Sequence, residues 1–166
     1  MNSKHRMLFA ILPPAVAAGV GSIGARSAKP VYARLRKPPW APPAAAFGPV
    51  WSVLYILIGA AGWRVAGSTR QAKVLHFVQL GCNAMWPITF FTMRNRRAAV
   101  VVVALLDAAL VGEIGILWRR DRRAAALLLP YLAWSGFATM LNLAVTDEQE
   151  SDVDHGSAAL RSPQSR

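Results

Sequence analysis

Two acidic side chains, Asp107 and Glu113, lie inside an otherwise apolar stretch of this 166-residue chain. A carboxylate is costly to place in hydrocarbon, so an acidic residue within such a span is by default a candidate functional group. The six-residue spacing points the two side chains to different sides of a helix, so they do not form an acid–base pair. We expect Asp107 to be neutral or hydrogen-bonded to a Ser, Asn or Tyr, and Glu113 to reach water at the interface. A packing role and a transport role both remain open for Asp107.

Aromatic residues recur at helical spacing. Trp51 and Tyr55 are four residues apart and Tyr131 and Trp134 are three apart, which places each pair on one helical face. Ala138 and Leu141 extend the face of Tyr131 and Trp134. Two other predicted helices have faces of their own, one with Asn83, Pro87 and Phe90 and one with the small residues Ala18, Ser22 and Ala25. Rings from separate helices predict an interior cavity for a flat apolar ligand. The alternative is that the rings anchor the protein at the membrane interface, which suits Trp63 and Trp118 well.

The composition indicates a membrane protein. Hydrophobic residues make up 54% and charged residues 16%, which is too apolar for a soluble domain of this size. The formal charge of +11 comes from basic residues between apolar runs, where they meet lipid headgroups, so nucleic acid is not expected as a partner. One cysteine, Cys82, and three scattered histidines predict neither a disulfide within the chain nor a metal site. His76 is expected to lie at the interface.

Five apolar runs are long enough to cross a bilayer as helices. They are residues 7–25, 47–63, 74–93, 98–118 and 124–145. A signal peptide is the competing interpretation of the first run, since Lys4 and Arg6 form a basic start. The later connections are short, so consecutive helices are expected to be antiparallel neighbours. The predicted fold class is therefore an all-α membrane protein, a bundle of five transmembrane helices.

The segments outside the predicted spans differ in character. The first connection, about residues 26–46, is long enough to have its own structure. We assign residues 1–146 to the transmembrane domain and residues 147–166 to an acidic tail that is expected to be disordered. Nine Lys and Arg residues fall on the N-terminal side of five spans and ten on the other. The positive-inside rule therefore does not set the orientation.

Four motifs carry a resemblance to a known family. They are KPPWAPP at 37–43, FGPVWSVLY at 47–55, NAMWPITFF at 83–91 and PYLAWSGFATMLN at 130–142. With these motifs in this order, the chain resembles the TspO/MBR family. This family comprises bacterial tryptophan-rich sensory proteins and the mitochondrial translocator protein. The resemblance implies a five-helix bundle, commonly a homodimer, whose first loop closes a cavity as a lid. It implies porphyrin or haem as a ligand and no obligatory cofactor. The Ala- and Arg-rich composition favours a bacterial plasma membrane.

The resemblance also implies a set of ligand-binding residues. They are Ser22, Ala25, Phe47, Gly48, Val50, Trp51, Tyr55, Asn83, Leu110, Trp134, Ala138 and Leu141. We add Phe90 for ring stacking, and Trp40, Pro42 and Pro43 as a rigid lid. Arg34, Arg36 and Lys37 are expected at the cavity mouth, where they would pair with propionates. The residues after Asn142 lack the Tyr-then-basic pattern proposed for sterol contact, which argues against a sterol role.

Three functions are consistent with these residues. The first is an integral membrane protein that binds a tetrapyrrole in a sensory, regulatory or transport role. The second is a light-dependent porphyrin-degrading enzyme in which Trp51 and Trp134 are catalytic. The third is a small proton-coupled transporter that uses Asp107 or Glu113.

Overall fold

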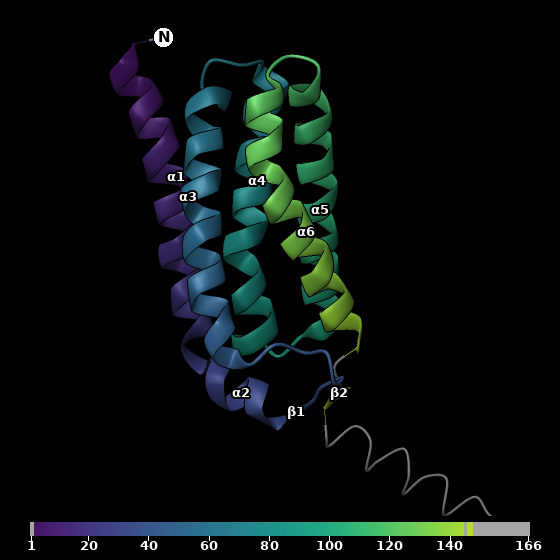
Figure 1. Cartoon of the computed structure of the whole chain (residues 1–166). Helices are drawn as coiled ribbons and strands as arrows, with labels where there is room; N and C mark the ends of the chain where they lie inside the picture. Colours follow the sequence, from purple (N-terminus) through teal and green to yellow (C-terminus); the bar gives the residue numbers. More distant parts are fainter. Residues whose placement is uncertain (1, 145, 148–166) are drawn as a thin grey trace, which may run out of the picture.

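The computed structural model describes residues 2–144 and 146–147, and the rest of the predicted acidic tail lies outside the described residues. Five long helices of this part run side by side (Figure 1). They are α1 (Ser3–Gly24), α3 (Phe47–Val65), α4 (Arg70–Pro87), α5 (Arg96–Trp118) and α6 (Arg122–Ala144). A π-helical segment, η3 (Ile88–Thr92), continues α4.

Four of the long helices in the described part of the chain have the length and hydropathy of membrane spans. The candidate spans contain α1, α3, α5 and α6, so the predicted class of helical membrane protein is confirmed. The helix α4 lies where a span was predicted but is not among these candidates. Its buried face carries His76, Gln79 and Asn83, and these polar residues lower its mean hydropathy.

Local sequence signals explain where the helices begin. Thr69 accepts a hydrogen bond from the Ala72 amide at 3.2 Å, and Asn95 accepts one from the Ala98 amide at 3.0 Å. Each side chain thereby satisfies an amide that the first helical turn leaves unpaired. Pro49 lies in the first turn of α3, where its missing N–H removes no helical hydrogen bond.

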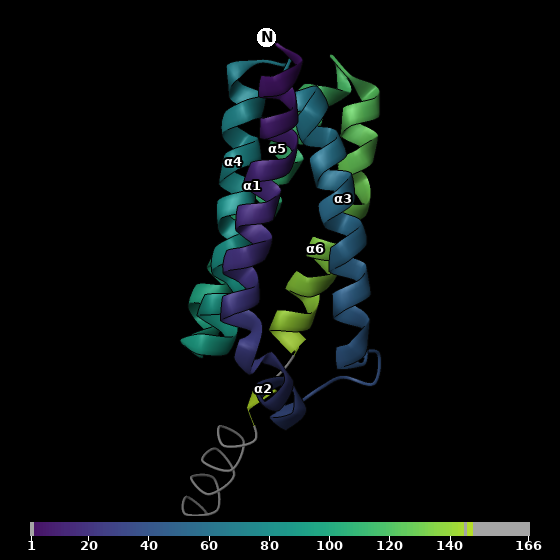
Figure 2. The same cartoon turned by 90° about the vertical axis from the view of Figure 1, so that its left-hand side faces the viewer.

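The helices form a closed ring in which α1 lies between α3 and α4 (Figure 2). The other main contacts join α4 to α5, α5 to α6 and α6 to α3. The expectation that consecutive helices are neighbours is therefore correct for α4–α5 and α5–α6 but wrong for α3–α4, which share few contacts. The connection of residues 66–69 spans the end of α1, so a short loop does not require direct packing.

The first connection has its own structure, as predicted. It contains η1 (Ala25–Ser27), α2 (Ala28–Arg34), β1 (Leu35–Arg36) and η2 (Ala44–Ala46). The helix α2 lies at the end of the bundle that is far from the N-terminus (Figure 1). The strand β1 pairs antiparallel with β2 (Thr146–Asp147), with Leu35 opposite Asp147. The first residue of the predicted tail is thus paired with the first connection.

The core and the surface of the bundle are both apolar. Ile58, Leu110, Leu117, Leu128 and Tyr131 are fully buried in the main cluster. Large apolar side chains also cover the outside of the helices, among them Met7, Leu12, Ile56, Val101 and Met140. A surface of this kind is stable in hydrocarbon and would aggregate in water, in agreement with a bilayer environment.

Candidate functional site

A cavity of about 310 Å³ lies in the half of the bundle next to α2. Its wall comes from α1, α2, α3 and α4 and from the residues beside them. The lining residues are Ala18, Gly21, Ser22, Ala25, Ala28, Lys29, Tyr32, Ala44, Phe47, Gly48, Trp51, Tyr55, Asn83, Trp86, Pro87 and Phe91. Small residues on α1 face aromatic rings on α3 and α4, which leaves room for a flat apolar group.

The cavity brings together seven residues that sequence reasoning proposed as ligand-binding positions. They are Ser22, Ala25, Phe47, Gly48, Trp51, Tyr55 and Asn83. Ser22 and Gly48 are exposed, so the cavity opens to the surface between the ends of α1 and α3. The faces predicted from helical spacing on three separate helices therefore converge on one hollow.

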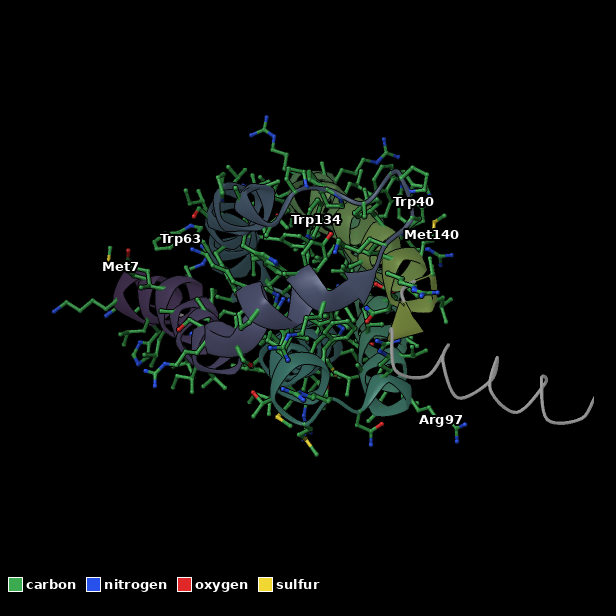
Figure 3. All side chains as sticks on the ribbon, turned by 90° about the horizontal axis from the view of Figure 1, so that it is seen from below. Met7, Trp40, Trp63, Arg97, Trp134 and Met140 are labelled. Carbon is green, nitrogen blue, oxygen red and sulfur yellow. The ribbon has the colours of Figure 1, made fainter. Side chains whose placement is uncertain are left out.

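Trp134 and Trp40 lie outside the lining but connect to it through other rings. The Trp134 ring is 5.8 Å from that of Phe47 and 5.5 Å from that of Phe137. The Trp40 ring is 5.7 Å from that of Phe137. Figure 3 shows Trp134 towards the middle of the bundle and Trp40 at its edge. Trp134 thus contacts the lining of the cavity through Phe47.

The other proposed positions do not line the cavity. Leu110 is fully buried in the main core, and Val50 packs against that core. Phe90 and Leu141 are buried in a second cluster near α2. The carbonyl of Ala138 accepts a hydrogen bond from Asn142 at 2.9 Å. Pro42 accepts one from the Tyr32 hydroxyl at 2.7 Å, and Pro43 is exposed.

Asn83 holds the inner wall of the cavity together. The Tyr55 hydroxyl donates to Asn83 Oδ1 at 2.7 Å, and Asn83 Nδ2 donates to the Tyr131 hydroxyl at 2.8 Å. These bonds join α3, α4 and α6 around a side chain that is 4% exposed. Interhelical hydrogen bonds of this kind fix helix positions in a dry interior.

The chain matches a known family over nearly all of its described length. The model of the TspO/MBR family matches residues 9–147. The chain belongs to the TspO/MBR family. It is similar to the tryptophan-rich protein TspO of Archaeoglobus fulgidus, at 38% identity over 125 residues, which cover 73% of this chain and 81% of the relative.

Two further relatives carry names that describe the family. The human translocator protein is 39% identical over 121 residues, which cover 69% of this chain and 72% of the relative. The tryptophan-rich sensory protein of Cereibacter sphaeroides is 34% identical over 113 residues, which cover 67% of this chain and 72% of the relative. The chain is therefore an integral membrane protein of a family of sensory and translocator proteins.

Lys29 is a cavity residue of this TspO/MBR chain that sequence reasoning missed. It is the one charged side chain in the described lining. Lys37, which was expected at the mouth, instead donates from Nζ to the carbonyls of Tyr32 at 2.8 Å and Leu35 at 2.9 Å. Lys29 and Tyr32 are three residues apart on α2, but no helix was predicted within the connection, and this spacing was therefore not used.

The two acidic residues of α5 have partners on other helices. Thr139 Oγ1 donates to Asp107 Oδ2 at 2.8 Å, so Asp107 is hydrogen-bonded within the bundle, to a partner type that was not expected. Glu113 and His76 are both 0% exposed, which makes the expected interfacial positions wrong. Since α4 packs closely on α5, both side chains are enclosed even though each is near a helix end.

In the described part of the chain, no three His, Cys, Asp or Glu side chains are arranged to hold a metal ion.

Proposed function

We propose that this protein binds a porphyrin-like tetrapyrrole in the cavity, within a membrane that all five long helices cross. The observation that carries the proposal is the wall itself, in which Phe47, Trp51 and Trp86 on two helices face the small residues of α1. Indole and phenyl rings bind flat apolar ligands by stacking and dispersion. The half-buried ring of Trp51, with Tyr55 at 5.5 Å, is the principal stacking surface.

The charge at the cavity suits an acidic ligand. Lys29 has no acidic neighbour among the described residues of the lining, and no hydrogen bond or ion pair to another described residue holds its ammonium group. Tetrapyrroles of the haem pathway carry propionates, which would pair with Lys29 while the macrocycle lies against Trp51. Arg34, the last residue of α2, and Arg36 in β1 are exposed and would add long-range attraction.

The first connection would act as the lid. The cavity of about 310 Å³ is at the small end of ligand sites, which range from about 300 to 1,000 Å³. A complete macrocycle therefore requires α2 and the loop with Trp40, Pro42 and Pro43 to move outward during binding. The fixed φ angles of the prolines would limit the entropy lost when the loop closes again.

Protoporphyrin binding to the purified protein in detergent tests the proposal. We expect a shift of the porphyrin absorption band, and a tenfold or greater loss of affinity in Trp51→Ala, which corresponds to about 1.4 kcal/mol. Trp118→Ala is the matched control, because Trp118 is 48% exposed at the far end of α5. Lys29→Gln should lower the affinity for protoporphyrin, which carries two free propionates, and leave the affinity for its dimethyl ester unchanged. Unchanged affinity in Trp51→Ala would contradict the proposal.

A light-dependent degradation of the bound porphyrin is the second candidate. It is favoured by one observation, namely that the indole of Trp51 forms part of the cavity wall. If Trp134 also acts, it must do so through Phe47, whose ring is 5.8 Å away. The expected result is a new absorption product under illumination in wild type and in Trp134→Phe, and none in Trp51→Phe. Stable porphyrin binding without a new product under illumination would support the binding function and contradict the degrading activity.

Two other expectations remain proposals. A homodimer is implied by the family resemblance, and cross-linking of the protein in membranes tests it. Proton-coupled transport through Asp107 or Glu113 predicts flux into proteoliposomes under a pH gradient. Asp107→Asn or Glu113→Gln should abolish this flux if the carboxyl groups carry the proton.

A further inference from the structure

Three polar side chains lie together in the core of the bundle, in the half away from α2. His76 and Gln79 come from α4 and Glu113 comes from α5, and all three are 0% exposed. His76 Nδ1 is 2.8 Å from Glu113 Oε1 and 3.3 Å from Gln79 Nε2. This cluster is separate from the cavity, because none of the three residues lines it.

Apolar groups of other helices close the cluster. The ring of Phe9 on α1 stacks on the imidazole of His76, with ring centres 5.6 Å apart and planes inclined by 24°. On α3, a Cβ added to Gly62 would lie 3.2 Å from His76 Nε2, so the backbone of α3 passes close to that edge of the imidazole. His76 Nε2, Gln79 Oε1 and Glu113 Oε2 have no hydrogen-bond partner among the described residues.

The contacts indicate where the proton lies. The amide nitrogen of Gln79 is a donor and lies 3.3 Å from His76 Nδ1, so a hydrogen on Nδ1 would set two donors against each other, and Nδ1 without a hydrogen is favoured. The single lone pair of Nδ1 then serves the shorter contact, at 2.8 Å, and the hydrogen in that contact belongs to Glu113. A carboxylate beside an imidazolium would leave a charged oxygen and a charged N–H unpaired in the core, and unpaired charged groups are far more costly to bury than neutral ones. We propose that Glu113 is a buried carboxylic acid that donates its O–H to neutral His76, making the α4–α5 contact a proton-binding site.

The nearby charged groups do not offer the pair a counter-ion. On α1, Arg6 lies over the ring of Trp63, 5.6 Å from its centre. On α3, Arg64 bonds to Asp121. On α4, Lys73 is one turn before His76, and on α5, Asp107 bonds to Thr139. In the described structure, His76 and Glu113 thus have each other as their only titratable hydrogen-bond partners.

The site binds a proton that the same side chains would release in water. At pH 7 a free glutamic acid is ionised and a free imidazole is mostly neutral. Opening of the α4–α5 contact to water would therefore break the O–H bond of Glu113, leave a carboxylate and transfer one proton to the solvent. The folded bundle holds this proton whether or not a ligand occupies the cavity, so the inference is independent of tetrapyrrole binding.

Infrared spectroscopy of the protein in detergent at pH 7 tests the site. We expect a carbonyl band of a protonated carboxylic acid in wild type that is absent from Glu113→Gln. Asp107→Asn is the matched control, a carboxyl group removed from the same helix, and it should retain the Glu113 band. The glutamine is isosteric with the protonated acid and can donate to Nδ1, so Glu113→Gln should fold. If Glu113→Gln leaves the carboxylic acid bands unchanged, the proposal is overturned.

Nitrogen NMR of the imidazoles gives a second measurement on the wild-type protein alone. At pH 7, His76 is expected to be neutral with its hydrogen on Nε2, which the two nitrogen signals of its imidazole would identify. An imidazolium signal from His76 at pH 7, or a hydrogen on Nδ1 in place of Nε2, would overturn the proposal even if the glutamine variant fails to fold.

Discussion

The hydroxyl group of Tyr55 on α3 donates a hydrogen bond to the side-chain oxygen of Asn83 on α4 over 2.7 Å. The two helices share few other contacts because α1 lies between them. Asn83 also donates to Tyr131 on α6, so one amide links three helices next to the cavity. This polar link, and not apolar packing alone, sets the distance across the inner wall.

Removal of the Tyr55 hydroxyl should destabilise the bundle. In Tyr55→Phe the oxygen of Asn83 loses its donor in a dry interior, and we expect a loss of about 1 kcal/mol, in the range of measured interhelical hydrogen bonds. Ser52→Ala on the same helix is the control, because among the described residues its exposed hydroxyl bonds only to the carbonyl of Gly48. Unfolding in mixed micelles measures both variants. Equal stability of the two would show that the Tyr55–Asn83 bond contributes nothing.

Gly24 is a position where a methyl group has no room. A Cβ there would lie 2.7 Å from the backbone nitrogen of Ile88, so Gly24→Ala must push α1 away from the junction of α4 and η3. We expect a loss of about 1 to 3 kcal/mol, as for other overpacked sites. Gly19→Ala is the control in the same helix, since nothing lies within 4 Å of its added Cβ. Its stability should be unchanged or raised by up to about 1 kcal/mol.

The pair of Arg64 and Asp121 should make stability depend on pH in the acid range. Hydrogen bonds from Arg64 at 2.8 and 3.0 Å hold the pKa of Asp121 below its ordinary value. The pair therefore contributes stability above about pH 3.9, the pKa of a free Asp, and this contribution is lost as the pH falls through the lower folded pKa. Both side chains are about one-third exposed, so the contribution is less than about 1 kcal/mol.

Two variants separate the charge of Asp121 from its role at the start of α6. Asp121 Oδ1 accepts from the Ala124 amide at 3.1 Å, and an asparagine would keep this cap. Asp121→Asn should thus lose the small ion-pair contribution at neutral pH and, with it, the acid dependence, whereas Asp121→Ala should lose about 1 kcal/mol more at every pH. Thermal unfolding between about pH 7 and pH 2.5 measures both. An acid dependence that persists unchanged in Asp121→Asn would assign it to other carboxyl groups.

Lys37 should hold the first connection in shape. Its ammonium group donates to the carbonyls of Tyr32, Ala33 and Leu35 at and just after the end of α2, and lies 5.0 Å from the centre of the Tyr32 ring. Lys37→Met keeps the length of the side chain but loses these bonds. Limited proteolysis should then cleave faster within residues 28–46, with the helical content unchanged. Lys29→Met, which breaks no such bond, should be cleaved at the wild-type rate.

The positions of the helices were predictable from the sequence, because length and apolar runs are local properties. The span predicted to begin at residue 47 does begin there, at the first residue of α3. The helical spacing of Trp51 and Tyr55 correctly indicated a shared face, and both residues line the cavity. These inferences need only the periodicity of one helix.

The partners of the helices were not predictable in the same way. Hydropathy gives the distance of Glu113 from a helix end but not the identity of the helix beside it, so its contact with His76 was missed. Lys29 lines the cavity because it lies on α2, a short helix within the first connection. The contact of Trp134 with Phe47 depends on the angle between α3 and α6. Each of these features is set by packing between segments that are distant in sequence.

The pairing of Leu35–Arg36 with Thr146–Asp147 gives the molecule a sidedness that can be measured. It brings the end of the last helix to the same face as the connection that borders the cavity, while the N-terminus lies at the opposite face (Figure 1). A membrane-impermeant dye attached at a cysteine introduced at Thr146 would therefore report from the compartment that the cavity faces. Labelling of intact cells and of inverted vesicles would show from which side of the membrane the cavity is supplied.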